Sequence, residues 1–234
     1  MPTIKVMSAG AVESMVRAIG AEFERASGHG LDLDFGTAGA LRERIGKGEA
    51  TDVLILPAQA IAALDKDGTI APGSITDLAR SVSGLAVREG AAAPDISTPE
   101  AFTQALLKAR AVSFSDPKAG GSSGNFMARM LAKHGIADQV FAKAVLGKRG
   151  YEVAQAVADG RAEIGTTFIS ELMTVPGVRI VGPLPGEWFN DNTYTAAIPK
   201  SSAARAVAQA FIRALTDPAT RGRWTAAGLE PAFA

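Results

Sequence analysis

Apolar and polar residues follow a repeated strand-then-helix order in the first part of the chain. Each short apolar run is followed by a segment whose apolar residues recur at helical spacing on one face. The pattern predicts three such units: strand 4–8 with helix 12–23, strand 31–35 with a helix over 41–45, and strand 51–56 with helix 58–64. Successive units of this kind indicate parallel strands with helices on both faces, so the predicted fold class is α/β.

The same order restarts after a looser connection at residues 71–74. The pattern then predicts strands at 81–87, 111–114, 143–146, 163–168, 178–181 and 193–198, and helices from Thr98, Asn125, Tyr151, Ser201 or Ser202, and Pro218. We expect two α/β lobes: lobe 1 from residues 1–80 and 196–234, and lobe 2 from residues 81–195. The chain would cross between the lobes twice, which forms a two-segment hinge with an interlobe cleft.

The composition is that of a globular protein whose charges cancel. Hydrophobic residues make up 47% of the 234 residues, and 24 basic side chains balance 24 acidic ones. No net field favours nucleic acid or an acidic membrane surface, so an anion would have to be bound locally. No apolar run approaches the roughly 20 residues that span a bilayer. We therefore expect neither nucleic-acid binding nor membrane insertion.

Two further features of the sequence bear on chemistry and compartment. The chain has no cysteine, and its two histidines, His29 and His134, are far apart and expected at the surface, so we predict no metal site. The first residues open directly into a strand pattern without the basic start and apolar stretch of a secretory signal. The chain is then cytoplasmic as given, or periplasmic if a leader was removed. We expect a monomer without a cofactor.

Four junctions share the order of a strand, small residues and a helix: 8–11, 36–40, 120–124 and 148–150. In parallel α/β sheets the carboxyl ends of the strands share one edge, where the following helices present N–H groups. Each helix N-terminus carries about half a positive charge, so these junctions suit a small anion. The alternative for any one junction is an ordinary tight turn, in which glycine and serine are common. No P-loop lysine pattern is present, so nucleotide phosphates are not expected.

Several segments together resemble the molybdate-binding branch of type 2 periplasmic binding proteins. They are "IKVMSAGAVESMVRAIGAEFE", "FGTAGALRERIGKGEATDVLIL", "SDPKAGGSSGNFMARML" and "VADGRAEIG", in this order along nearly the whole chain. The resemblance implies two α/β lobes joined by two crossing segments, with the ligand held in the cleft. It also implies a solute-binding protein that, if exported, delivers its ligand to the membrane subunits of an ABC transporter.

The chain departs from this family at its side-chain ligands. Family members that bind molybdate or tungstate hold the oxyanion with serine hydroxyls at the first two junctions and a tyrosine hydroxyl in the second lobe. The matching positions here are Ala11, Ala38 and Phe168, which have no hydroxyl, while the main-chain donors near Ser123 and Gly150 survive. Loss of three donors at about 1.5 to 3 kcal/mol each weakens tight oxyanion binding by orders of magnitude. We therefore expect a different anion.

The residues at the four junctions suit an organic di- or tricarboxylate. An arginine fork matches a planar carboxylate, and Arg149 lies in a glycine-flanked loop. Arg42, which is followed by Glu43 and Arg44, fits a solvated helix face better. The predicted ligand-binding residues are Ser8, Gly10, Ala11, Thr37, Ala38, Gly39, Ser122, Ser123, Gly124, Arg149, Gly150, Tyr151 and Phe168.

The resemblance leaves an enzyme as the alternative, because some members of the wider group resemble aconitate isomerase. Isomerisation of an aconitate-like polycarboxylate needs a base to remove a proton beside a carboxylate and an acid to return it at the neighbouring carbon. The candidate catalytic residues are Tyr151 and Glu171, with Asp191 as a further acidic group. For Glu171 the competing interpretation is an ordinary carboxylate at the start of a helix.

Overall fold

The computed structural model describes residues 3–234. The chain forms two compact units: unit 1, Met1–Ser81 with Asn192–Ala234, and unit 2, Val82–Asp191. The chain passes from one unit to the other within two strands, β4 (Thr76–Arg88) and β9 (Asp191–Ala197). The sequence pattern placed these crossings after residues 80 and 195.

Unit 1 is built on parallel strands with two antiparallel additions. β1 (Thr3–Ala9) pairs in parallel with both β2 (Gly30–Gly36) and β3 (Val53–Pro57). β9 pairs antiparallel with β3, and β10 (Leu229–Pro231) pairs antiparallel with β4. In the register of β1 and β2, Ala9 lies opposite Gly36, so the carboxyl ends of these strands are level. The first two junctions therefore lie at one edge of the sheet.

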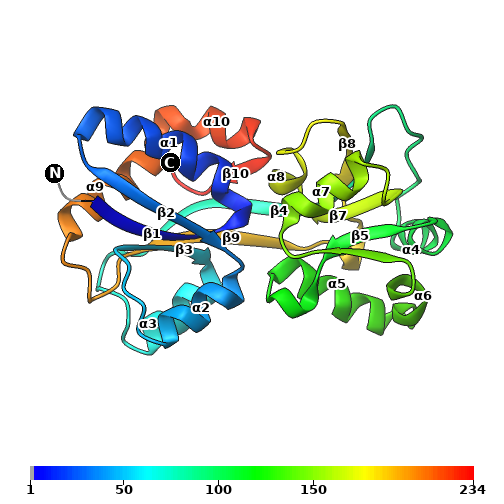
Figure 1. Cartoon of the computed structure of the whole chain (residues 1–234), viewed down its shortest axis with the longest axis horizontal. Coiled ribbons are helices and arrows are strands. Elements are labelled where there is room, and N and C mark those ends of the chain that lie inside the picture. Colours follow the sequence, from blue (N-terminus) through cyan, green and yellow to red (C-terminus); the bar gives the residue numbers. More distant parts are fainter. Residues whose placement is uncertain (1–2) are drawn as a thin grey trace. The chain divides into compact units, whose positions relative to one another are not determined.

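Helices cover both faces of the unit 1 sheet (Figure 1). Figure 1 shows α1 (Glu13–Ser27) and α9 (Arg205–Leu215) on one side of the strands, and α2 (Ala38–Gly46) and α3 (Ala58–Lys66) on the other. A buried cluster that includes Leu41, Leu54 and Ile61 joins α2 and α3 to the sheet. The shorter elements are η1 (Gly10–Val12), η4 (Pro218–Thr220) and α10 (Arg221–Ala226).

Unit 2 repeats this plan with a second parallel core. β5 (Val112–Ser115) lies between β6 (Ala144–Gly147) and β7 (Ile164–Phe168) and pairs in parallel with both. β4 pairs antiparallel with β7 and with β8 (Val178–Pro183). The predicted α/β class is therefore confirmed, with parallel strands at the centre of each unit and antiparallel strands beside them.

The helices of unit 2 pack on both faces of its sheet. Their bounds are α4 (Pro99–Lys108), η2 (Pro117–Ala119), α5 (Ser122–Lys133), α6 (Ala137–Phe141), α7 (Gly150–Ala158), α8 (Ile169–Leu172) and η3 (Gly186–Trp188). α4, α5 and α6 share a buried cluster with Phe114 and Trp188, whereas Val153 and Leu172 of α7 and α8 belong to a separate cluster. The His134 ring stacks on Trp188 with centroids 4.7 Å apart, and its side chain stays 21% exposed, so His134 lies half-buried at the surface.

Several predicted element starts differ in the structure, among them those of β4, α5 and α9. β4 begins at Thr76 rather than residue 81, because its first part pairs with β10. α5 begins at Ser122, three residues before the predicted Asn125. α9 begins at Arg205 after the N-cap residue Ala204, and the Ser202 hydroxyl accepts from the Ala204 N–H at 3.3 Å while it donates to Asp52 Oδ1 at 2.7 Å.

Candidate functional site

The junction after β5 is a tightly built turn that leads straight into α5. Asp116 accepts a hydrogen bond from the Lys118 N–H at 2.9 Å and so caps η2, and Gly120 then reverses the chain with a φ of 74°. A Cβ on Gly124 would lie 2.3 Å from the Ser115 carbonyl oxygen, so the first turn of α5 packs directly on the end of β5. This glycine and serine stretch is therefore a βα turn rather than a flexible linker.

Three hydroxyl groups meet beside this turn. Ser115 ends β5, Ser123 lies in the first turn of α5, and Thr167 lies near the end of β7. The Ser123 hydroxyl donates to Ser115 Oγ at 3.3 Å and lies 3.2 Å from Thr167 Oγ1, and Ser115 Oγ lies 3.4 Å from Thr167 Oγ1. Ser115 and Thr167 are buried, and a hydrogen bond in such a low-dielectric environment is stronger than in water.

The hydroxyl cluster ends on a carboxylate, that of Glu171. Thr167 Oγ1 donates to Glu171 Oε2 at 2.8 Å, and the main-chain N–H groups of Gly150 and Phe168 also hydrogen-bond to this carboxylate. A Cβ on Gly150 would lie 2.0 Å from Glu171 Oε2, so only glycine leaves room for the carboxylate here. Glu171 therefore occupies the N-terminus of α7.

Burial raises the pKa of Glu171 above its ordinary value. The Thr167 hydroxyl, the Gly150 N–H and the positive charge of Arg149 act in the opposite direction, but desolvation outweighs them. The residue keeps some contact with solvent. A carboxyl group in this situation can donate a hydrogen bond as a neutral acid or exchange a proton with a bound molecule.

Arg149 and Tyr151 lie at the start of the same helix, α7. Arg149 is its N-cap residue, and the guanidinium carbon lies 5.3 Å from the centre of the Tyr151 ring. Tyr151 is 45% exposed, so it is available to a solute but is not held in a buried network as Glu171 is. Of the two predicted catalytic candidates, Glu171 has the more perturbed surroundings.

The predicted residues of unit 1 form local contacts. The buried Ser8 hydroxyl donates to the Ala9 carbonyl at 3.2 Å, and Thr37 Oγ1 accepts from the Ala40 N–H at 3.3 Å as the N-cap of α2. Ala11 is buried in η1, and Ala38 is the first residue of α2. Unit 1 holds Ser8, Gly10, Ala11, Thr37, Ala38 and Gly39, while unit 2 holds Ser122, Ser123, Gly124, Arg149, Gly150, Tyr151 and Phe168.

Two residues of the hydroxyl cluster, Ser115 and Thr167, were missed by the sequence analysis. Both are polar residues near the carboxyl ends of parallel strands, which is the edge where ligands bind in open α/β sheets. Phe168, the residue matched to the family's tyrosine, is buried, and the hydroxyl next to it in the chain belongs to Thr167.

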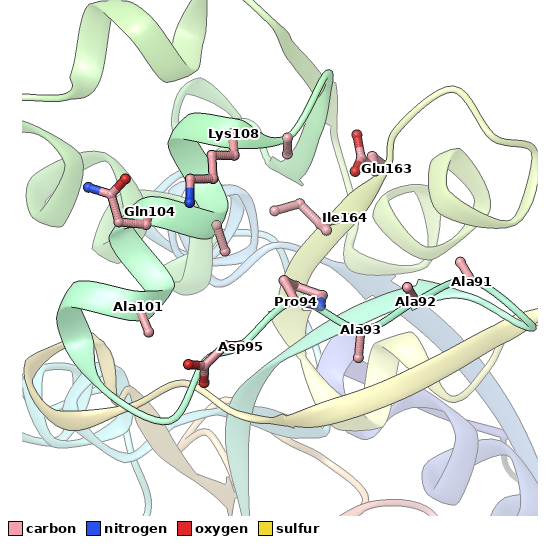
Figure 2. Close-up of a pocket in the computed structure, with 12 residues that line it drawn as sticks. Ala91, Ala92, Ala93, Pro94, Asp95, Ala101, Gln104, Lys108, Glu163 and Ile164 are labelled. Atoms are coloured by element: carbon pink, nitrogen blue, oxygen red, sulfur yellow. The ribbon is translucent and has the colours of Figure 1, made fainter.

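A cavity of about 540 Å³ lies elsewhere in unit 2, beside the amino ends of β5 and β7 (Figure 2). Figure 2 shows Ala91, Ala92 and Ala93 along one side of it and α4 with Lys108 along another. Its charged lining residues are Asp95, Lys108 and Glu163. Two carboxylates against one lysine do not favour an anion, so this cavity is not the predicted site.

Neither a metal centre nor a membrane span is found in residues 3–234. No group of three or more His, Cys, Asp or Glu residues there is arranged to hold a metal ion. Over the same residues, no helix has both the length and the apolar character needed to cross a bilayer.

Two α/β units with parallel central strands, linked by two crossing strands, define a class: the bilobal periplasmic-binding-protein fold. A family model described as bacterial extracellular solute-binding protein matches residues 4–230. The chain therefore belongs to this family of solute-binding proteins, as the resemblance in the sequence implied.

Relatives within and beyond this family include one curated protein and many solved structures. An aconitate isomerase from Pseudomonas sp. is 31% identical over 234 residues, covering 98% of this chain and 88% of that protein. The periplasmic molybdate-binding protein of Azotobacter vinelandii superposes with a TM-score of 0.74 at 21% identity, covering 97% and 98% of the two chains. The substrate-binding protein of an ABC transporter from Agrobacterium tumefaciens superposes with a TM-score of 0.77 at 16% identity, covering 96% of this chain and 77% of that chain.

Proposed function

We propose that this solute-binding protein binds a small organic di- or tricarboxylate rather than molybdate. The observation that carries the proposal is the Glu171 carboxylate, which occupies the N-terminus of α7. In an oxyanion site this helix end would offer its N–H groups to the ligand. An internal carboxylate at that place takes up these donors, so they are not offered to a compact dianion such as molybdate.

The remaining groups of the candidate site suit a carboxylate better than a tetrahedral oxyanion. Ala11 and Phe168 are buried and apolar, so they offer no side-chain hydrogen bond. The first turn of α5 follows Gly121, which has no side chain to cap it, and Ser123 adds a hydroxyl there. Arg149 supplies a planar guanidinium that matches a planar carboxylate. We propose the first turn of α5 and Arg149 as the main anion contacts of unit 2.

A thermal-shift screen tests the ligand class. Molybdate, tungstate, sulfate and phosphate would be compared with succinate, citrate, tricarballylate and trans-aconitate. A ligand at 100 times its dissociation constant stabilises the protein by about 2.7 kcal/mol, which is easily measured. We expect a response to a di- or tricarboxylate and none to molybdate. A strong response to molybdate or tungstate alone would refute the proposal.

A pair of substitutions at Ser123 tests the place of binding. Ser123→Pro removes the main-chain N–H within the first helical turn, where proline is tolerated, while Ser123→Ala removes only the hydroxyl. Loss of a charge-assisted hydrogen bond of about 1.5 to 3 kcal/mol predicts a loss of affinity of roughly 10- to 150-fold for Ser123→Pro. Unchanged affinity in both folded variants would show that the ligand binds elsewhere. If the protein is exported, we propose the membrane subunits of an ABC transporter as its partner.

The second candidate function is isomerisation of an aconitate-like polycarboxylate without a cofactor. It is favoured by Glu171, whose raised pKa and hydroxyl partners suit proton exchange, and by the 31% identity to an aconitate isomerase. In this reaction Glu171 would take a proton from the carbon beside a carboxylate, the double bond would shift, and the proton would return at the other carbon.

Proton NMR of trans-aconitate with the protein in D2O tests this activity. Turnover predicts appearance of the cis isomer and deuterium uptake. Both should be lost in Glu171→Gln and kept in Gln155→Ala, which changes an exposed residue of α7. Absence of both the cis isomer and deuterium uptake, in a protein that binds trans-aconitate, would leave binding as the function.

A further inference from the structure

We propose that Glu171 sets the selectivity of the site by binding the ligand as a neutral acid, so that ligand binding is coupled to the uptake of one proton. This inference rests on the proposed function, because it concerns a carboxylate ligand at the first turn of α5. It adds that the protein binds a ligand together with a proton. Protonation removes the negative charge of Glu171, so the site needs no further arginine to accept an anionic ligand.

The geometry gives Glu171 a fixed place near the proposed ligand. Its carboxylate is held at the N-terminus of α7 by the Gly150 N–H and by Thr167 Oγ1. Thr167 in turn lies 3.2 Å from the Ser123 hydroxyl, in the first turn of α5. The Ser123 hydroxyl is therefore two hydrogen bonds away from the Glu171 carboxylate, and a ligand carboxylate bound at Ser123 is three away. A second carboxylate of the same ligand that reaches Glu171 would bring two like charges together, which favours protonation of one of them.

The charged groups around Glu171 supply little compensation. On α7, Arg149 lowers the pKa of Glu171, but burial outweighs its effect. Glu152, also on α7, accepts from the Lys148 N–H at 2.9 Å, and Arg179 on β8, a strand packed against α8, donates to the Ala91 carbonyl at 2.8 Å. β5, β7 and α5 contribute the hydroxyls of the cluster described above. A second negative charge from a ligand beside Glu171 would therefore raise the pKa of this carboxyl group further.

Protonation of Glu171 lets this residue bind a ligand oxygen that the ionised carboxylate would repel. Its O–H group can donate to a carboxylate or hydroxyl oxygen of the ligand, while its other oxygen still accepts from the helix N-terminus. Ionised Glu171 has acceptors only and opposes any ligand oxygen that carries charge. The site then prefers a ligand whose extended carbon chain separates one carboxylate at α5 from an acceptor beside Glu171.

The test measures proton uptake on binding of trans-aconitate. Titration calorimetry would be run from pH 7 to pH 9, where this ligand is fully ionised, in buffers that differ in ionisation enthalpy. Above the pKa of free Glu171 the dissociation constant should rise about tenfold per pH unit, with uptake approaching one proton. Glu171→Gln should bind without this pH dependence, because an amide cannot titrate.

Two further variants make the test specific. Gly150→Ala keeps the α7 N–H but places a Cβ where Glu171 Oε2 lies, so the carboxylate is displaced and the pH dependence should weaken. Glu152→Gln alters a carboxylate in the same helix turn that contacts the Lys148 N–H instead, and should keep the wild-type slope.

The outcomes separate this inference from the proposed function. Binding of trans-aconitate by the wild type with a constant affinity and no proton uptake would overturn the inference and leave the carboxylate-binding function intact. A full pH slope in folded Glu171→Gln would overturn it as well. If no carboxylate binds to either protein, the proposed function fails and takes the inference with it. The wild-type slope and proton count decide the question even if Glu171→Gln does not fold.

Discussion

The strand-to-helix junctions of the two units use similar residues in different ways. In unit 1 the hydroxyls of Ser8 and Thr37 bond to main-chain groups one and three residues away. In unit 2 the hydroxyls of Ser123 and Thr167 bond to side chains from other strands and helices, and the series ends on Glu171. The same small polar residues thus stabilise local turns in one unit and connect four elements in the other.

This difference shows which unit carries the distinctive chemistry of the chain. A local hydrogen bond such as a helix cap stabilises its own turn and leaves the neighbouring junctions unaffected. A buried network fixes the position and protonation of every member, so a change at one residue is felt at the others. We therefore expect the junctions of unit 2 to contribute the groups that select the ligand.

The largest expected effect is on the close packing of the α5 junction. Gly124→Ala would place a Cβ 2.3 Å from the Ser115 carbonyl oxygen, a backbone atom that cannot move aside. Overpacking of this kind costs about 1 to 3 kcal/mol. The control is Gly222→Ala in α10 of unit 1, where nothing lies within 4 Å and a gain of about 0.5 to 1 kcal/mol is expected. Urea unfolding of both variants measures the contrast, and equal stabilities would contradict it.

The next effect is on the pH dependence of stability. Because the pKa of Glu171 is raised in the folded protein, the folded state holds this proton to a higher pH than the unfolded state does. The stabilisation that this proton provides is fully present below pH 4.5, the ordinary pKa of the group, and is lost as the pH rises through the raised pKa of the folded protein. Each unit of pKa difference corresponds to about 1.4 kcal/mol.

The glutamine in Glu171→Gln cannot titrate. The free energy of unfolding of this variant should therefore increase relative to that of the wild type as the pH rises from 4.5 upward. Other groups titrate equally in both proteins and cancel in the difference. Unfolding by urea at a series of pH values measures this difference, and a constant difference across the range would show that the pKa of Glu171 is not raised.

A smaller effect is the coupling between residues within each unit. The double-mutant cycle Thr167→Val with Glu171→Gln should give an interaction energy of about 0.5 to 3 kcal/mol, because the two side chains share a hydrogen bond of 2.8 Å. The cycle Ser8→Ala with Thr37→Ala should be additive within about 0.5 kcal/mol, because each hydroxyl bonds locally. Equal coupling in the two units would refute the comparison.

The smallest effect is expected at the cap of α2. Thr37→Ala removes an N-cap oxygen that lies 3.3 Å from the Ala40 N–H, which is a long hydrogen bond. A loss of about 0.5 kcal/mol, the low end for N-caps, is therefore expected, and Thr37→Ser should restore it. A larger loss, measured by thermal unfolding, would show that Thr37 has a role beyond its own helix.

Much of the fold followed from periodicity, because the α/β class is encoded locally in the alternation of strands and helices. The start of β4 was misplaced, since its pairing with β10 joins residues far apart in sequence. α9 begins at Arg205, beyond the expected start at Ser201 or Ser202. The α5 junction was identified from its glycines and serines, but the reason for Gly124 is its contact with Ser115, which only the packed turn shows.

The sequence by itself determined the α/β class, the family, and the small residues at the ends of the strands, because these depend on local spacing and residue type. It also places Ala11, Ala38 and Phe168, which have no hydroxyl, at the positions that the resemblance matches to the family's side-chain ligands. Only the tertiary structure decided that Ser115, Ser123, Thr167 and Glu171 form one network at the start of α5 and α7. Burial and proximity, which set the protonation of Glu171, arise from segments that the chain brings together only on folding.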